Sequence, residues 1–198
     1  EYKNFKISSY WSLKKEINNR NILPNDRSKI ISSFKEKFRN TVSSQLISDT
    51  NVGAFLSGGI DSSLVVSFMK EVSTKPFDTF TIGFKEKDFS EDLKAKELTS
   101  HLGIKNNQLF LDGKDMIDVV SKIPKIYDEP FADSSQIPTF LLSQFASKNV
   151  KVVLSGDGGD EMFGGYNRYF LINKIWKFLK FMPYYIRKKI AFIMSSCP

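Results

Sequence analysis

The sequence predicts an α/β fold in which a parallel sheet carries helices on both faces. Short apolar stretches rich in β-branched residues alternate along the chain with segments whose apolar residues recur at helical spacing. Two of the apolar stretches, residues 52–56 and 150–154, stop abruptly at glycine-rich turns. Because alternating strands and helices form parallel sheets with right-handed crossovers, we expect these turns at the carboxyl ends of neighbouring strands.

The expected strands are residues 52–56, 77–84, 107–111 and 150–154. The last of them contains Val150, Val152, Val153 and Leu154 and suits a strand that is buried on both faces of the sheet. Because such runs are short, apolar and bounded by turn residues, we interpret them as strands rather than helices.

The expected helices begin at recognisable residues or carry an apolar stripe. Residues 1–25 are expected to be an irregular lead-in, and residues 27–48 a long helix. The helix after the first strand begins near Ile60, with the stripe Ile60, Leu64, Val65, Phe68, Met69 and Val72. Further helices are expected at 91–102, at 116–127 with an interruption near Pro124, after an N-cap at Ser135, and in the tail with a break at Pro183.

Composition restricts the class of protein. A chain of 198 residues with 41% hydrophobic content can bury one sizeable core. A single cysteine, Cys197, excludes an internal disulfide and fits a reducing cytoplasm, and a lone His101, placed on the surface at a helix end, argues against a zinc site. No signal peptide is visible and no apolar run approaches the ~18 residues of a membrane span, so no membrane partner is expected.

The net charge of +7 is a property of the tail. Residues 162–198 contain seven bases and no acid, namely Arg168, Lys174, Lys177, Lys180, Arg187, Lys188 and Lys189. Aromatic and aliphatic residues alternate with these bases, as in amphipathic helices. We interpret the tail as helices that pack on further chain, and expect self-association through Ile172, Trp176, Leu179, Ile186, Ile190 and Ile193; binding to a membrane surface is the alternative.

The turn after the first strand, SGGIDSS at residues 57–63, has the features of an anion site. Backbone N–H groups at a helix N-terminus attract negative charge, and the hydroxyls of Ser57, Ser62 and Ser63 add donors. Asp61 would repel a phosphate unless a metal bridges the two, so the turn predicts a metal-bound polyphosphate.

The turn after the last strand, SGDGGDE at residues 155–161, places three carboxylates among three glycines. Such a run is either a solvated Asp-Gly turn or a site for a hard cation such as Mg²⁺. Because both turns are expected at the carboxyl edge of the sheet, where the strand order reverses, one Mg²⁺-pyrophosphate between them is the favoured interpretation.

Neither a Walker A motif nor a dinucleotide fingerprint is present, and SGGIDSS instead resembles the pyrophosphate loop of the ATP pyrophosphatases. Together with LSGDGGDEMFGGY at 154–166, FTIGF at 80–84 and YDEPFADSSQIPTFLLS at 127–143, it resembles the synthetase domain of glutamine-hydrolysing asparagine synthetases. This resemblance covers most of residues 50–170. It implies a Rossmann-like fold of the adenine nucleotide α-hydrolase type, and an ATP-dependent amide ligase that adenylylates a carboxylate, first of all aspartate, for attack by ammonia from glutamine.

The resemblance also implies roles for individual residues. It assigns the pyrophosphate part of ATP to Ser57, Gly58, Gly59, Asp61 and Ser62, and Mg²⁺ to Asp61 and Asp160. It places adenosine at Leu56, Ile82, Gly83, Ser155 and Gly156, although Leu56 and Ile82 are equally consistent with plain sheet core. Asp157 is expected to be catalytic together with Asp61 and Asp160, and Asp157, Tyr166 and Arg168 are expected to bind the substrate carboxylate.

The sequence departs from this family in several respects. Asp157 stands where asparagine synthetases commonly carry a glutamate, so another carboxylate, such as a sugar acid, is an alternative substrate. The family's downstream catalytic lysine and its N-terminal glutaminase cysteine have no counterpart here, so we expect a fragment without the glutaminase domain. The expected parts are a lead-in at 1–26, the synthetase domain at 27–170 and the start of a further part at 171–198.

A second class of function remains open. A non-catalytic nucleotide-binding module or a tRNA-acting relative would also carry SGGxDSS, and the basic tail would then contact anionic polymer. The acidic turn favours the ligase, so no nucleic-acid partner is expected. Four polar residues near the start of the helix expected after Ser135 could face the same strand ends or cap that helix, namely Glu129, Asp133, Ser134 and Ser135. Glu91 is a weaker candidate and could instead cap its own helix.

Overall fold

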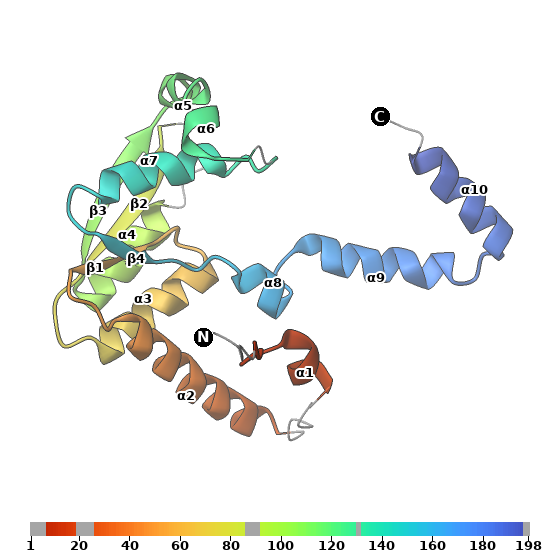
Figure 1. Cartoon of the computed structure of the whole chain (residues 1–198), viewed down its shortest axis with the longest axis horizontal. Helices are drawn as coiled ribbons and strands as arrows, with labels where there is room; N and C mark the ends of the chain where they lie inside the picture. The colour runs from red at the N-terminus through yellow and green to blue at the C-terminus, as the bar shows by residue number, and fades with distance from the viewer. Residues whose placement is uncertain (1–6, 19–25, 86–91, 130–131, 196–198) are drawn as a thin grey trace, which may run out of the picture. The chain divides into compact units, whose positions relative to one another are not determined.

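The computed structural model describes residues 7–18, 26–85, 92–129 and 132–195 (Figure 1). The chain divides into two units, residues 1–41 and 42–198. In the first unit, helix α1 (Leu13–Asn18) occupies part of the segment that we expected to be irregular, so that expectation was wrong for these six residues. Helix α2 (Arg27–Gln45) begins where predicted and ends three residues earlier than the expected Ser48.

A four-stranded parallel sheet forms the centre of the second unit, as predicted. The strands are β1 (Val52–Phe55), β2 (Asp78–Phe84), β3 (Lys105–Leu111) and β4 (Val152–Leu154). Their order is β3-β2-β1-β4, and every neighbouring pair is parallel. The chain therefore proceeds outward from β1 to β3 and then returns to the other side of β1, which makes the β1–β4 boundary the point where strand order reverses.

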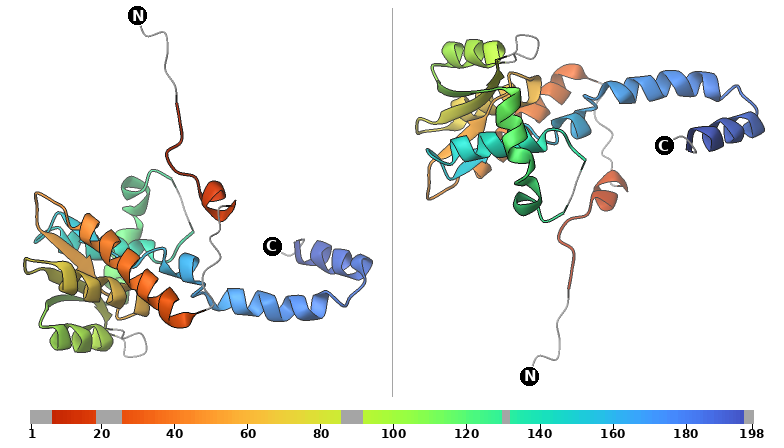
Figure 2. Two further views of the ribbon diagram at one scale, coloured as in Figure 1. Left: turned by 90° about the horizontal axis from the view of Figure 1, so that it is seen from below. Right: turned by 90° about the horizontal axis from the view of Figure 1, so that it is seen from above.

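Helices connect the strands and cover both faces of the sheet. Figure 2 shows α3 (Ile60–Val72) and α4 (Asp92–Leu102) on one face, and α5 (Gly113–Val120) and α7 (Gln136–Ala146) on the other. The break near Pro124 is present, because α6 (Ile123–Ile126) follows α5 with proline in its first turn. After β4 come α8 (Gly159–Phe163), α9 (Asn167–Leu179) and α10 (Tyr184–Ser195), the last two separated at Pro183 as predicted.

Apolar side chains of α3 and the central strands fill the interior. Val65, Phe68 and Met69 are buried, which confirms the middle of the predicted stripe, but Ile60 at the start of the helix is 85% exposed. On the opposite face Phe80 packs edge-on against Phe145 of α7, with 6.0 Å between ring centroids. The sheet and α3 are thus held rigidly enough to fix the turn between them.

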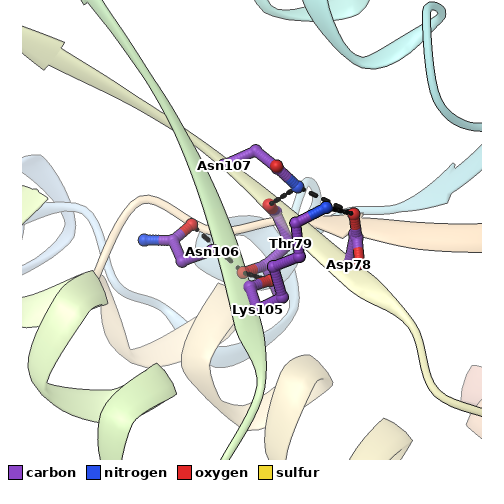
Figure 3. Close-up of polar contacts among 5 residues, drawn as sticks. All are labelled: Asp78, Thr79, Lys105, Asn106 and Asn107. Atoms are coloured by element: carbon purple, nitrogen blue, oxygen red, sulfur yellow. Dashed lines mark hydrogen bonds and ion pairs between the residues drawn. The ribbon is translucent and has the colours of Figure 1, made fainter.

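Polar side chains fix the register between β2 and β3 (Figure 3). The Lys105 Nζ and Asn107 Nδ2 atoms both donate to Asp78 Oδ2, at 2.9 and 3.0 Å. The Thr79 hydroxyl donates to the carbonyl oxygen of Lys105 and to Asn106 Oδ1, at 3.2 and 3.1 Å. Because a slip of one residue would turn every side chain to the other face, these contacts determine where the carboxyl end of β2 lies.

Two expectations about local structure were wrong. Strand β4 lies at the edge of the described sheet, so Val152 is 41% exposed and the strand is not buried on both faces. Ser135 stands at the N-cap of α7, but its side chain makes no capping hydrogen bond; instead the Asp133 carboxylate accepts from the Ser135 N–H at 2.8 Å. The hydrophobic pattern of β4 was read correctly as a strand, but it could not reveal the absence of a neighbour on one side.

Helices α9 and α10 contain no buried residue. Of the predicted apolar residues, Ile172, Trp176, Ile186 and Ile193 are between 46% and 63% exposed, whereas Leu179 and Ile190 are half-buried. Among the described residues no helix is both long and apolar enough to cross a membrane. His101 lies exposed in the last turn of α4, as expected.

We predict that the chain self-associates through α9 and α10, because large exposed apolar surfaces associate in water. Replacing Phe178 and Phe192, which are 78% and 72% exposed, by serine should shift the chain toward monomer. The control is Ile117→Ser on α5, a site of similar exposure at 71%. Sedimentation equilibrium over a range of concentrations measures the shift, and a parent chain that is monomeric throughout would contradict the prediction.

A second prediction concerns the start of α5, where Asp112 accepts hydrogen bonds from the backbone of Lys114 and Asp115 and pairs with Lys85 Nζ at 2.8 Å. The Lys85 hydrogen bond and the backbone donors lower the pKa of Asp112 to about 2. Because the folded pKa lies below the ordinary value of 3.8, the stabilisation is present above about pH 4 and is lost as pH falls toward 2. In urea titrations, Asp112→Asn should therefore destabilise the chain at pH 6 and have little effect near pH 2.

Candidate functional site

The turn between β1 and α3 is shaped by its own serine hydroxyls. The Ser57 and Ser62 Oγ atoms lie 3.0 Å apart, the Gly59 N–H donates to Ser57 Oγ at 3.1 Å, and the Ser57 N–H donates to Ser62 Oγ at 3.2 Å. Gly58 has φ +83°, a conformation that favours glycine. The N-cap residue of α3, Gly59, makes no side-chain capping hydrogen bond. Backbone N–H groups at a helix N-terminus of this kind can bind an anion.

The carboxylate-bearing turn follows β4. Gly158 has φ +86°, and α8 begins at the next residue. The Ser155 hydroxyl donates to Asp157 Oδ2 at 3.0 Å, which holds this exposed carboxylate near the strand end. Gly164, with φ +70°, ends α8 after five residues and returns the chain toward Asp160.

The two turns are in contact with each other. Strand β4 pairs with β1 in the register Val52↔Val152 to Ala54↔Leu154, so both turns leave the same edge of the sheet. A Cβ atom at Gly156 would lie 2.6 Å from the backbone N of Ser62, and one at Gly159 would lie 2.6 Å from Asp61 Oδ2. The structure therefore brings together Ser57 to Ser62 and Ser155 to Asp160, as the sequence predicted.

Asp61 and Asp160 both lie against bare backbone. The Asp61 carboxylate lies where a Cβ atom of Gly159 would stand. The Asp160 carboxylate likewise lies where a Cβ atom of Gly165 would stand. Among the residues that the structure describes, no group of three or more acidic, histidine or cysteine side chains gathers into a metal cage. A cation here would need to complete its coordination with oxygens of a ligand, and hard carboxylate oxygens beside an anion site suit Mg²⁺ in that way.

Tyr166 and Arg168 form a cluster with Glu161, which sequence reasoning missed. The Tyr166 hydroxyl donates to Glu161 Oε1 at 2.6 Å, and the Arg168 guanidinium lies 4.1 Å from the centroid of the Tyr166 ring. The hydrogen bond to Glu161 raises the pKa of Tyr166 to about 12 and lowers that of Glu161. The glycine pair at 164–165 was the available signal, because a reversal there brings a residue of α8 back to Tyr166.

The predicted adenosine residues divide into two groups. Leu56 is 1% exposed and its carbonyl accepts from the Thr81 hydroxyl at 2.8 Å, so its side chain belongs to the core. Ile82 is half-buried and Gly83 is buried at the end of β2, where a Cβ would lie 2.6 Å from the ring of Phe110. Ser155 and Gly156 lie in the turn after β4, so the two groups belong to the ends of β2 and β4, which lie on either side of β1.

The remaining candidates lie apart from this arrangement. Glu129, Asp133, Ser134 and Ser135 are all exposed, and hydrogen bonding to Ser135 lowers the pKa of Asp133. Nothing in the described contacts joins these four residues to the two turns. Glu91 lies outside the described residues.

Comparison with known proteins gives consistent matches. A family model described as asparagine synthase matches residues 33–195. Asparagine synthetase [glutamine-hydrolyzing] 1 of Bacillus subtilis is 40% identical over 144 residues, which is 73% of this chain and 23% of the relative. The putative asparagine synthetase [glutamine-hydrolyzing] 2 of Methanocaldococcus jannaschii is 41% identical over 162 residues, which is 78% of this chain and 31% of the relative. The chain thus spans 23% and 31% of the length of these two relatives.

Solved structures match more distantly. The NH3-dependent NAD synthetase of Campylobacter jejuni is 18% identical, with a TM-score of 0.48 over 69% of this chain and 60% of that chain. The NMN synthetase of Francisella tularensis is 19% identical, also with a TM-score of 0.48, over 68% of this chain and 58% of that chain. Likenesses of this size carry no argument about the site, and the fold class rests on the parallel sheet itself.

The contact between the turns predicts a steep cost for one added methyl group. Gly156→Ala would place Cβ against the backbone N of Ser62, where no flexible side chain can yield, and should destabilise the chain by about 1–3 kcal/mol. Gly113→Ala in the first turn of α5 is the matched control, because nothing lies within 4 Å of its Cβ position. Urea unfolding of both variants tests this, and equal stabilities would show that the two turns do not pack against each other.

Proposed function

The chain belongs to the asparagine synthase family, and from this premise we propose that it holds the synthetase site of an ATP-dependent amide ligase. The observation that carries the proposal is the direct contact between the uncapped start of α3 and the carboxylate turn after β4. One turn offers backbone donors to phosphate and the other offers carboxylates. The relatives from Bacillus subtilis and Methanocaldococcus jannaschii, a glutamine-hydrolysing asparagine synthetase and a putative one, agree with this proposal.

The proposed reaction has two steps. An oxygen of the substrate carboxylate attacks the α-phosphorus of ATP, and pyrophosphate leaves with the electron pair of the bond that breaks. Ammonia then attacks the carbonyl carbon of the acyl-adenylate, and the amide forms as AMP departs and a proton is released. Ser57, Gly58, Gly59 and Ser62 shape the turn whose backbone N–H groups would hold the leaving pyrophosphate.

We assign Mg²⁺ to Asp61, whose carboxylate lies against Gly159, and to Asp160, whose carboxylate lies against Gly165. When bound, the ion would neutralise charge on the pyrophosphate. Without it these carboxylates would repel the nucleotide. The adenosine part is assigned to the backbone of Ile82, Gly83, Ser155 and Gly156, with Leu56 as packing beneath it.

The substrate carboxylate is assigned to the side beyond the acidic turn, where Arg168 offers a guanidinium and Tyr166 lies beside it. We propose Asp157, whose carboxylate accepts a hydrogen bond from the Ser155 hydroxyl, as the catalytic carboxylate that also contacts the substrate. We propose aspartate as the substrate, with a sugar acid as the alternative that the shorter Asp157 suggests. Ammonia would come from glutamine hydrolysed elsewhere in the enzyme.

The carboxylate pair gives a test that depends on the metal. Asp61→Ala and Asp160→Ala should each weaken ATP binding by about tenfold or more in the presence of Mg²⁺, because each removes a ligand of the bridging ion. In EDTA the same substitutions should leave the weak residual binding unchanged or improve it, since a repulsive charge is gone. Isothermal calorimetry measures both conditions.

Asp118→Ala is the matched control, because Asp118 is an exposed carboxylate on the distant helix α5. It should bind ATP as the parent does in both conditions. Equal losses from Asp61→Ala and Asp160→Ala with and without Mg²⁺ would refute the metal assignment. A parent chain that binds no nucleotide would refute the proposed site for this chain.

A further inference from the structure

Two consecutive carboxylates of α8 have different surroundings. Asp160 lies against Gly165 and beside the turn that carries Asp61, whereas Glu161 accepts a hydrogen bond of 2.6 Å from the Tyr166 hydroxyl. Successive residues of a helix point about 100° apart, so neighbouring carboxylates cannot serve the same ligand from the same side. The Glu161 carboxylate therefore has a different partner from the Asp160 carboxylate, which is the one assigned to the metal.

The Arg168 guanidinium stacks on the Tyr166 ring, whose hydroxyl donates to Glu161. Arg168 lies 4.1 Å from the centroid of the Tyr166 ring and 5.9 Å from that of Tyr169, and the two rings meet edge to face at 5.6 Å. Among the described residues the structure gives Arg168 no hydrogen bond and no ion pair. Stacking on an aromatic face leaves the donor edge of a guanidinium open, and that edge suits a carboxylate bound through two parallel hydrogen bonds.

We propose that Glu161 is a positioning residue, which fixes the Tyr166 ring through its hydroxyl and thereby holds the Arg168 guanidinium ready for the substrate carboxylate. The choice of ligand rests on the function proposed above, whereas the positioning chain from Glu161 to Tyr166 to Arg168 does not. An exposed arginine has many rotamers, and holding it on a fixed ring lowers the entropy that it loses when it binds an anion.

The carboxylate that accepts from Tyr166 is that of Glu161. Gly164, in the left-handed conformation, ends α8 after five residues, and Tyr166 follows two residues later. Arg168 also lies near Glu161, yet it contacts the ring rather than the carboxylate. Glu161 thus acts on Arg168 through the tyrosine and not as its ion-pair partner.

The first test measures how well Arg168 is held. Phenylglyoxal labels exposed guanidinium groups, and mass spectrometry of a digest gives the rate at Arg168 relative to exposed Arg27 in the same sample. Glu161→Ala and Tyr166→Phe should each raise the relative rate at Arg168 about threefold or more, because both break the same hydrogen bond. Glu161→Gln, which keeps an acceptor, should restore part of the protection, and Glu97→Ala, an exposed glutamate of α4, should change nothing.

The double variant Glu161→Ala with Tyr166→Phe separates positioning from general loosening. If the two residues act as one unit, its rate equals that of either single variant. If the increase in the labelling rate of the double variant equals the product of the two single increases, the residues act independently, and the proposal would be overturned. An unchanged rate in Glu161→Ala would overturn it as well.

The second test reads the hydrogen bond directly. The Glu161 contact raises the pKa of Tyr166 to about 12, so the phenol of Tyr166 should ionise at a higher pH than an ordinary tyrosine. In Glu161→Gln the phenol should titrate at a lower pH than in the parent chain, because the charge of the acceptor is gone. Absorbance at about 295 nm, with circular dichroism at each pH to confirm the fold, measures the shift, and a titration identical to that of the parent would overturn the proposal.

The role of the ligand is decided separately. Aspartate together with Mg²⁺ and a non-hydrolysable ATP analogue should slow the labelling of Arg168 in the parent chain and fail to do so in Glu161→Ala. If labelling responds to Glu161 but aspartate gives no protection, the positioning stands and the proposed substrate is wrong. Protection that is equal in the parent and in Glu161→Ala would overturn the positioning.

Discussion

The whole site depends on the closeness with which two backbone turns approach each other. At Gly156 and Gly159 there is no room for a single carbon atom, because the start of α3 and the carboxylate of Asp61 already fill that space. Backbone against backbone is the closest packing that a chain can make, and it aligns peptide dipoles with carboxylates at short range. The chemistry assigned to Asp61 and Asp160 follows from this contact, since separated turns could not share one cation.

The sheet makes that contact inevitable once the strands are in order. Strand β1 is the pivot, with β2 and β3 on one side and β4 on the other, so the two turns leave adjacent strands in the same direction. The hydrogen bonds of Asp78, Lys105 and Asn107 secure the outer part of the sheet, and the core around Phe80 secures its middle. The positions of the two turns are therefore set by the sheet and by the core around Phe80.

Much of the fold and of the two turns could be predicted, because these features depend on local sequence patterns. Strand and helix alternation, the break at Pro183 and the two glycine turns all depend on residues close in sequence, and a parallel sheet then brings the turns together. The misses have a different origin. The exposure of Val152 depends on a neighbouring strand, and the pairing of Glu161 with Tyr166 depends on the reversal of the chain at Gly164. Residues whose partners are set by tertiary contacts cannot be assigned from spacing alone.

The pairing of β1 with β4 also affects the time at which the site can exist during folding. Val52 pairs with Val152, so this contact closes a loop of a hundred residues, whereas β1–β2 and β2–β3 join segments that are close in sequence. Contacts between distant residues carry the larger loop-closure cost and slow the search for the native topology. Strand β4 is also short, with three residues and an open edge. A nucleotide that contacts both turns would therefore stabilise the β1–β4 pairing, which is the least favourable in the sheet. Such a ligand would stabilise the folded chain in addition to being a substrate.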